Sequence, residues 1–161
     1  MITLVFLFPA CSSGAADRTE QHIADYEAAV AAAETVVADH AAAVATAATI
    51  EDVDALEDAF AMDWEAAHAQ VDEQMDMLEG CEMDDEDMGM MDEAAMAMGD
   101  ADASAMDHVA EHDAHTALSE CLTAEDAHET SMMEHLDAMM EHGDHWRDST
   151  HCEEMGDMGE M

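Results

Sequence analysis

Apolar residues recur at alternating spacings of three and four residues along most of the chain, the pattern of amphipathic helices. Thr49, followed by Glu51 and Asp52, marks a helix start between the first two stripes, and Gly80 ends the second one. The predicted helices occupy about 17–48, 50–79, 93–119 and 124–148. The segment between the second and third helices, 80–92, has no apolar face and is expected to be an acidic linker.

Short connections between successive helices favour antiparallel neighbours, so the helices form two hairpins. A shift of 72 positions relates the hairpins, because it carries His40 onto His112 and Glu57 onto Glu129. The sequence therefore predicts an all-α fold: an antiparallel up-down-up-down four-helix bundle, spanning residues 17–148, made of two pseudo-repeated helical hairpins.

Composition supports one helical domain and limits the partners. A chain of 161 residues with a single proline and 4% aromatic residues is expected to pack helices through small and flexible side chains. Only Arg18 and Arg147 oppose 42 carboxylates, so the formal net charge is −40. Nucleic acid and anionic lipid surfaces are excluded as partners because both would be repelled. Metal cations are the natural partners, while protein partners stay open.

The N-terminus is a short apolar run that is too brief for a transmembrane helix and ends in a small residue. Cys11 follows it directly, ahead of Ser12, Ser13 and Gly14. In this respect the segment resembles bacterial lipoprotein precursors. The resemblance implies a signal peptide at 1–10, lipidation of Cys11, a tether at 11–16 and a lipid-anchored protein of the cell envelope, facing the periplasm or the surface. The alternative is an apolar N-terminus without an export function.

Three further cysteines remain if Cys11 carries lipid. In an oxidising compartment we expect a disulfide between Cys81 and Cys152, which lie at the same end of the predicted bundle, with Cys121 left as a free thiol at the opposite end. The last residues, 149–161, are expected to form a Met-rich acidic tail.

A polar residue inside a helical core stripe must find a partner once it is buried. His40, Glu57, His112 and Glu129 occupy such positions and lie at similar distances from the predicted turns. Two imidazoles and two carboxylates converging from four helices predict a site for zinc, iron, manganese or copper. The alternative is a hydrogen-bonded polar layer that fixes the helix register without metal.

Histidine and methionine also gather on the third and fourth predicted helices. The additional or alternative ligands are His108, His115, His128, Met132, His135, Met139 and His142. Imidazole and thioether together favour Cu(I), because soft sulfur donors bind soft cations. Met132 to His135 and Met139 to His142 both follow the pattern M-x-x-H, which is similar to that of Met- and His-rich periplasmic copper- and silver-binding proteins. The alternative is that the methionines are adaptable core residues.

These observations predict a non-enzymatic envelope lipoprotein that binds or buffers a transition metal, copper first and zinc second. One alternative is a metal-free structural bundle at the cell surface. Another is a ferritin-like di-iron redox protein, because Glu65 to His68 and Glu125 to His128 both follow the pattern E-x-x-H. No EF-hand loop, phosphate-binding loop or nucleophile elbow is present in the sequence.

Overall fold

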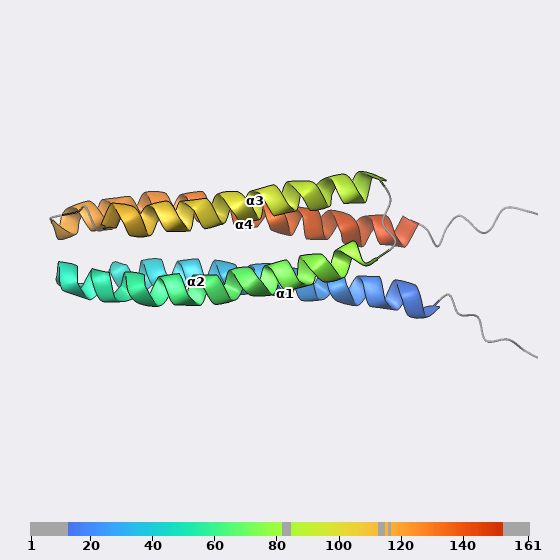
Figure 1. Cartoon of the computed structure of the whole chain (residues 1–161), viewed down its shortest axis with the longest axis horizontal. Coiled ribbons are helices and arrows are strands. Elements are labelled where there is room, and N and C mark those ends of the chain that lie inside the picture. Colours follow the sequence, from blue (N-terminus) through green and yellow to red (C-terminus); the bar gives the residue numbers. More distant parts are fainter. Residues whose placement is uncertain (1–12, 82–84, 113–114, 116, 153–161) are drawn as a thin grey trace, which may run out of the picture.

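The computed structural model describes residues 13–81, 85–112, 115 and 117–152, and these residues form four long helices (Figure 1). The helices are α1 Ser13–Val44, α2 Ile50–Glu79, α3 Asp85–His112 and α4 Leu118–Cys152. Helix α1 packs against α2 and α4, while α3 packs against α4 and α2. The α1–α2 and α3–α4 turns lie at one end of the bundle, and the end of α2 faces the start of α3 at the other. The predicted fold class is confirmed.

The start of α2 follows the sequence signal at Thr49. The Thr49 side chain accepts a hydrogen bond from the backbone N–H of Asp52, at 3.1 Å, and the Asp52 carboxylate accepts one from the backbone N–H of Thr49, at 3.0 Å. This capping box satisfies two N–H groups that a helix start otherwise leaves without a partner. The helix ends at Gly80, whose N–H donates to the carbonyl of Leu78.

Helices α3 and α4 begin earlier than the sequence pattern predicted. The acidic segment expected to be a linker is helical from Asp85 onward, and Met91 is buried in the core. Asp85, Glu86 and Asp87 occupy the first turn of α3, where carboxylates interact favourably with the helix dipole. The α3–α4 turn also comes earlier, since α3 ends at His112 and α4 starts at Leu118. The second hairpin is therefore displaced along the sequence.

This displacement corrects the spacing of the repeat from 72 to 68 positions. Buried residues of α1 and α2 recur as buried residues of α3 and α4 at this spacing. The pairs include Ile23 and Met91, Val30 and Met98, Val37 and Ala105, Val53 and Cys121, Trp64 and Met132, Val71 and Met139, and Leu78 and Trp146.

The buried residues form two apolar clusters of unequal size. The larger cluster fills most of the bundle, from Ile23 and Trp146 near the end away from the hairpin turns to Phe60 beside His40. The smaller one, around Val44, Val53 and Cys121, lies at the end with the two hairpin turns. Between them the helices bury a layer of polar side chains. Among the described residues, no helix is long and apolar enough to cross a membrane.

Candidate metal centre

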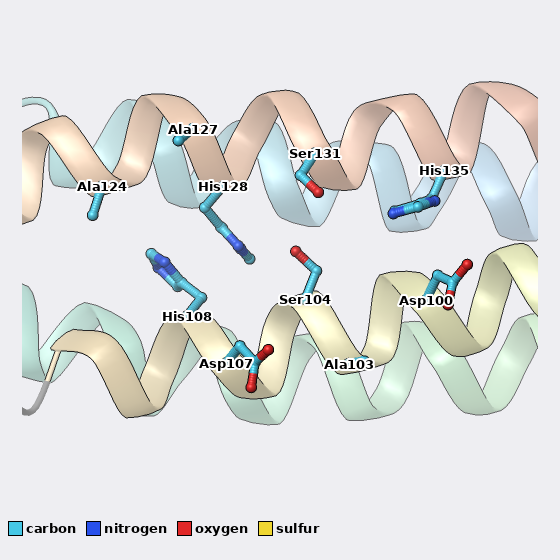
Figure 2. A pocket seen from close by; sticks show the side chains of 10 residues that line it. All are labelled: Asp100, Ala103, Ser104, Asp107, His108, Ala124, Ala127, His128, Ser131 and His135. Carbon is cyan, nitrogen blue, oxygen red and sulfur yellow. The ribbon is translucent and has the colours of Figure 1, made fainter.

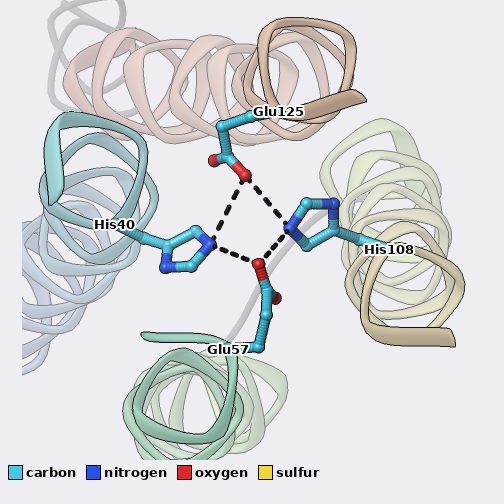
Figure 3. A group of neighbouring side chains, drawn as sticks. All are labelled: His40, Glu57, His108 and Glu125. Atoms are coloured by element: carbon cyan, nitrogen blue, oxygen red, sulfur yellow. Dashed lines mark hydrogen bonds and ion pairs between the residues drawn. The ribbon is translucent and has the colours of Figure 1, made fainter. Parts of the chain in front are cut away.

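Each of the four helices contributes one side chain to the buried polar layer (Figure 3). His40 comes from α1, Glu57 from α2, His108 from α3 and Glu125 from α4. All four residues are between 3% and 7% exposed. The two imidazoles face each other across the bundle axis, and the two carboxylates face each other along the other diagonal. Each imidazole therefore lies between two carboxylates.

The nitrogen and oxygen atoms of this layer form a closed ring of four short distances. The His40 Nε2 atom lies 3.3 Å from Glu57 Oε1 and 3.5 Å from Glu125 Oε2. The His108 Nε2 atom lies 3.2 Å from each of the same two oxygens. One ligand atom from each of the four residues lies within 4.8 Å of every other.

These distances fit the size of a transition-metal ion. Tetrahedral zinc is bound at about 2.0–2.1 Å from nitrogen and oxygen, which places neighbouring ligand atoms about 3.3 Å apart. The four nitrogen–oxygen distances, 3.2 to 3.5 Å, are already at that separation. A tetrahedral site has six such distances, and the remaining two, between the facing imidazoles and between the facing carboxylates, lie within 4.8 Å, so a tetrahedral ion would draw the facing donors closer together.

Without a metal ion, the four side chains hold one another in their charged forms. Burial alone would lower the pKa of His40, but the carboxylates of Glu125 and Glu57 outweigh this effect and raise it to about 9. The pKa of His108 is raised in the same way. Burial alone would raise the pKa of Glu57 and of Glu125, but the two imidazoles lower both to about 2. The layer then contains two imidazolium ions and two carboxylates, with no net charge.

Hydrogen bonding within the layer is incomplete despite the short distances. His108 Nε2 and Glu57 Oε1 form a hydrogen bond of 3.2 Å. The His40 Nε2 atom lies within ion-pair distance of Glu125 Oε2, but neither of these buried atoms has a hydrogen bond of normal geometry, and nor has the buried Glu125 Oε1. Buried polar atoms usually have such a bond, and these atoms could instead coordinate an ion held between the four side chains.

Aromatic rings support both imidazoles from the side of the larger apolar cluster. Phe60 stacks on His40 with ring centroids 4.4 Å apart. His128 stacks on His108 with centroids 3.6 Å apart and an interplanar angle of 11°. Burial, together with the positive charge of His108, lowers the pKa of His128 to about 4. His128 is therefore a neutral imidazole beside the layer.

The structure brings together His40 and Glu57 as the sequence predicted, but with different partners from the second hairpin. His108 and Glu125 each lie one helical turn before His112 and Glu129. Glu129 is half-buried outside the layer, and the side chain of His112 lies outside the described part of the chain. The difference arises because the α3–α4 turn lies nearer to residue 115 than to Cys121.

Glu125 is the residue that the sequence prediction missed as an interior ligand. The predicted start of the fourth helix at about residue 124 places Glu125 in its first turn, whereas α4 begins at Leu118, seven residues before Glu125. The signal that identifies it is the repeat spacing: 68 positions separate His40 from His108 and also Glu57 from Glu125.

The remaining predicted ligands do not join the layer: His115 lies between α3 and α4, and the others lie along α4. Met132 and Met139 are fully buried in the larger apolar cluster. His128 is buried next to the layer, whereas His115, His135 and His142 are half-buried. None of these residues belongs to the metal-ligand cluster found among the described side chains.

The predicted covalent sites mostly fall outside the described residues. Cys11 lies outside them, as does the side chain of Cys152. Cys81 is a free thiol that contacts the Met77 carbonyl at 3.6 Å, so the disulfide with Cys152 stays a prediction. Cys121 is a buried free thiol near the hairpin turns.

The layer has the donors for one metal ion rather than two. Ferritin-like di-iron bundles use four glutamates and two histidines, whereas the described cluster has two carboxylates. Glu65 is exposed and His68 is half-buried, and neither belongs to the cluster.

No protein-family model, curated protein or solved structure matches this chain.

Proposed function

We propose that this protein binds one divalent transition-metal ion through His40, Glu57, His108 and Glu125, and that it buffers this metal in the cell envelope as a lipid-anchored protein. The observation that carries the proposal is the ring of four nitrogen–oxygen distances, 3.2 to 3.5 Å, formed by side chains from four separate helices. A helix bundle holds these donors in place before the ion arrives, which reduces the cost of ordering them.

Charge balance supports a divalent ion at this centre. Two carboxylates carry a charge of −2, which either two imidazolium protons or one divalent cation neutralises. A buried group with net charge would be costly, so the layer suits these two neutral states. Binding the ion would release the two protons, because imidazole coordinates metals in its neutral form.

The donor atoms favour some metals over others. The centre offers nitrogen and oxygen and no sulfur, a set that suits Zn(II), Cu(II) and Fe(II) better than Cu(I). The expectation of Cu(I) depended on the thioethers of Met132 and Met139, which pack within the apolar core. We therefore propose Zn(II) or Cu(II) as the bound ion, with Cu(II) binding more tightly in accordance with the Irving–Williams order.

The envelope location depends on the N-terminal sequence. The apolar segment 1–10 followed by Cys11 supports export and lipidation. Expression in a bacterial host with an alkyne-labelled fatty acid tests this part. We expect wild-type protein to be labelled and Cys11→Ser to be unlabelled, and an unlabelled wild type would refute the lipid anchor.

The second candidate function is a structural bundle whose polar layer serves only to fix the helix register. The hydrogen bond between His108 and Glu57 favours it, because the layer can neutralise its own charges without metal. The two functions differ in how metal changes the stability of the fold. A metal site is stabilised by its metal, whereas a self-sufficient ion-pair layer is not.

The test uses the full chain after removal of metal with EDTA. Bound metal is measured after equilibration with Zn(II), Cu(II) or, under reducing conditions, Cu(I), and the melting temperature is compared with that in Ca(II) and in NaCl. We expect one Zn(II) or Cu(II) per chain and a higher melting temperature. No stoichiometric metal, and no stabilisation beyond that given by calcium or salt, would refute metal binding.

Two histidine variants locate the site. His108→Ala should abolish tight binding, whereas His142→Ala, which removes a half-buried imidazole outside the layer, should leave it unchanged. The opposite result would move the site to the methionine and histidine stripe of α4.

A further inference from the structure

A pocket of about 480 Å³ between α3 and α4 reaches the polar layer from the side (Figure 2). Its lining includes the two buried, stacked imidazoles of His108 and His128, together with the exposed side chains of Asp100 and Asp107. The pocket therefore connects solvent with an imidazole of the metal centre. The acidic residues at its mouth attract cations.

His128 presents a buried nitrogen that has no hydrogen-bond partner among the described residues. The residue is 7% exposed, and its Nε2 atom is buried without a hydrogen bond. A buried polar atom without a hydrogen bond destabilises the folded state. His128 is on α4 and His108 is on α3, and the His128 ring points into the space between these two helices. An imidazole nitrogen that lines the pocket beside the metal centre is placed to bind a metal ion that passes through it.

The first hairpin provides an internal comparison, because it repeats the second at a spacing of 68 positions. The pocket residues Ser104, Ala124 and His128 correspond to Val36, Leu56 and Phe60. Phe60 stacks on His40 just as His128 stacks on His108. The first hairpin thus has larger or apolar side chains at the positions where the second has small ones and an imidazole. The small side chains of Ser104 and Ala124 and the imidazole of His128 are therefore features of the second hairpin rather than of the repeat.

We propose that the α3–α4 pocket is the path by which a divalent transition-metal ion enters and leaves the centre, and that His128 binds the ion transiently on this path. The inference rests on the proposed metal-binding function. In this arrangement Asp100 and Asp107 draw the hydrated ion to the pocket. His128 then replaces part of its water shell before the ion reaches the four ligands.

The test narrows the α3–α4 pocket by introducing the larger side chains that stand at the corresponding positions of the first hairpin. Ser104→Val and Ala124→Leu, singly and together, fill the pocket without changing a metal ligand. Ala59→Leu, on the exposed face of α2, adds the same side chain outside the pocket and is the matched control. Stopped-flow absorbance follows Co(II) binding to the metal-free full chain, and a chromogenic chelator follows Zn(II) release.

We expect the double variant to bind and release the ion at least about tenfold more slowly, with its dissociation constant unchanged within about threefold. The control should match wild type. Unchanged rates in the double variant, or equal slowing in the control, would overturn the path. If circular dichroism shows that the double variant has lost its helices, the two single variants decide the question by the same criterion.

His128→Phe, which copies Phe60 of the first hairpin, tests the transient ligand. The expected result is slower binding and release with full occupancy at equilibrium. Complete loss of binding would show that His128 is a permanent ligand, and unchanged rates would show that it takes no part, so either result overturns its transient role. A wild-type chain that binds neither Co(II) nor Zn(II) at equilibrium would instead refute the metal-binding function and this inference together.

Discussion

Replacing the whole polar layer with apolar side chains tests whether the layer is a metal centre or a structural element. The variant carries His40→Leu, Glu57→Met, His108→Leu and Glu125→Met, which keep the size of each side chain similar. It removes the four ion-pair distances of 3.2 to 3.5 Å together, so no charged group is left buried alone. The two apolar clusters that flank the layer would then become continuous.

The expected free energies follow from the burial of the layer. Removing one partner of a buried ion pair costs about 3–5 kcal/mol, because the remaining charge stays buried without compensation. His108→Ala alone should therefore lower the melting temperature of the metal-free protein by roughly 6–20 °C for a chain of this size. Replacing a complete buried ionic group by apolar residues is often neutral or stabilising by about 1–4 kcal/mol. The quadruple variant should thus be at least as stable as wild type.

The assay is urea unfolding followed by circular dichroism in EDTA, repeated with Zn(II). We expect the quadruple variant to equal or exceed wild type in EDTA and to show no response to Zn(II), while wild type is stabilised by the metal. His108→Ala should be the least stable of the three proteins in EDTA. If the quadruple variant loses more than about 3 kcal/mol in EDTA, the layer itself stabilises the fold, which contradicts this reasoning and favours the structural function.

Three further predictions concern pH, helix capping and salt. In the metal-free protein, the pKa of His40 is raised to about 9, so its stabilising effect is complete below pH 6.5 and is lost as the pH rises through 9. The pKa of Glu57 is lowered to about 2, so its stabilising effect is complete above pH 4.5 and is lost as the pH falls through 2. Urea unfolding in EDTA should therefore show that the free energy of unfolding of wild type, relative to that of the quadruple variant, is highest between about pH 4.5 and 6.5. A difference between the two proteins that does not change with pH would contradict these ionisation states. Thr49→Ala removes the capping box and should cost about 1 kcal/mol in urea unfolding, with Thr35→Ala, on the exposed face of α1, as the control that should cost less. Raising NaCl from 0.05 to 1 M should raise the melting temperature, because salt screens repulsion in a chain of net charge −40, and a constant melting temperature would show that this repulsion is not significant.

The sequence predicted the helices and their pairing well, because burial follows the three-and-four spacing along each helix. Val53, Trp64 and Val71 are buried as that spacing requires, and Thr49 begins α2. For the first hairpin, the sequence therefore predicted correctly that His40 and Glu57 lie at the same level of the bundle. Its turn is marked by an unambiguous capping signal, and both residues lie within ten positions of it.

The second hairpin was harder because its turn has no comparable signal. Thr123 resembles a helix start in the sequence but lies on the exposed side of α4, where its hydroxyl donates to the Ser119 carbonyl at 2.9 Å. Misplacing the turn by several residues changes which histidine of α3 lies opposite which glutamate of α4. Periodicity alone does not detect this error, because His108 and His112 are one turn apart and share a helix face.

In the proposed metal-binding function, the two buried imidazoles would be the source of selectivity among cations, because carboxylates are present in excess. An acidic surface attracts every cation, and hard ions such as calcium and magnesium prefer the oxygen ligands that it supplies in quantity. His40 and His108 add nitrogen donors in a buried layer that is neutral only with two protons or one divalent ion. The surface thus raises the local concentration of all cations, and under the proposed function the interior would select those that bind imidazole. Two imidazoles held at 3.2 to 3.5 Å from two carboxylates would therefore determine which of the many attracted cations the protein keeps bound.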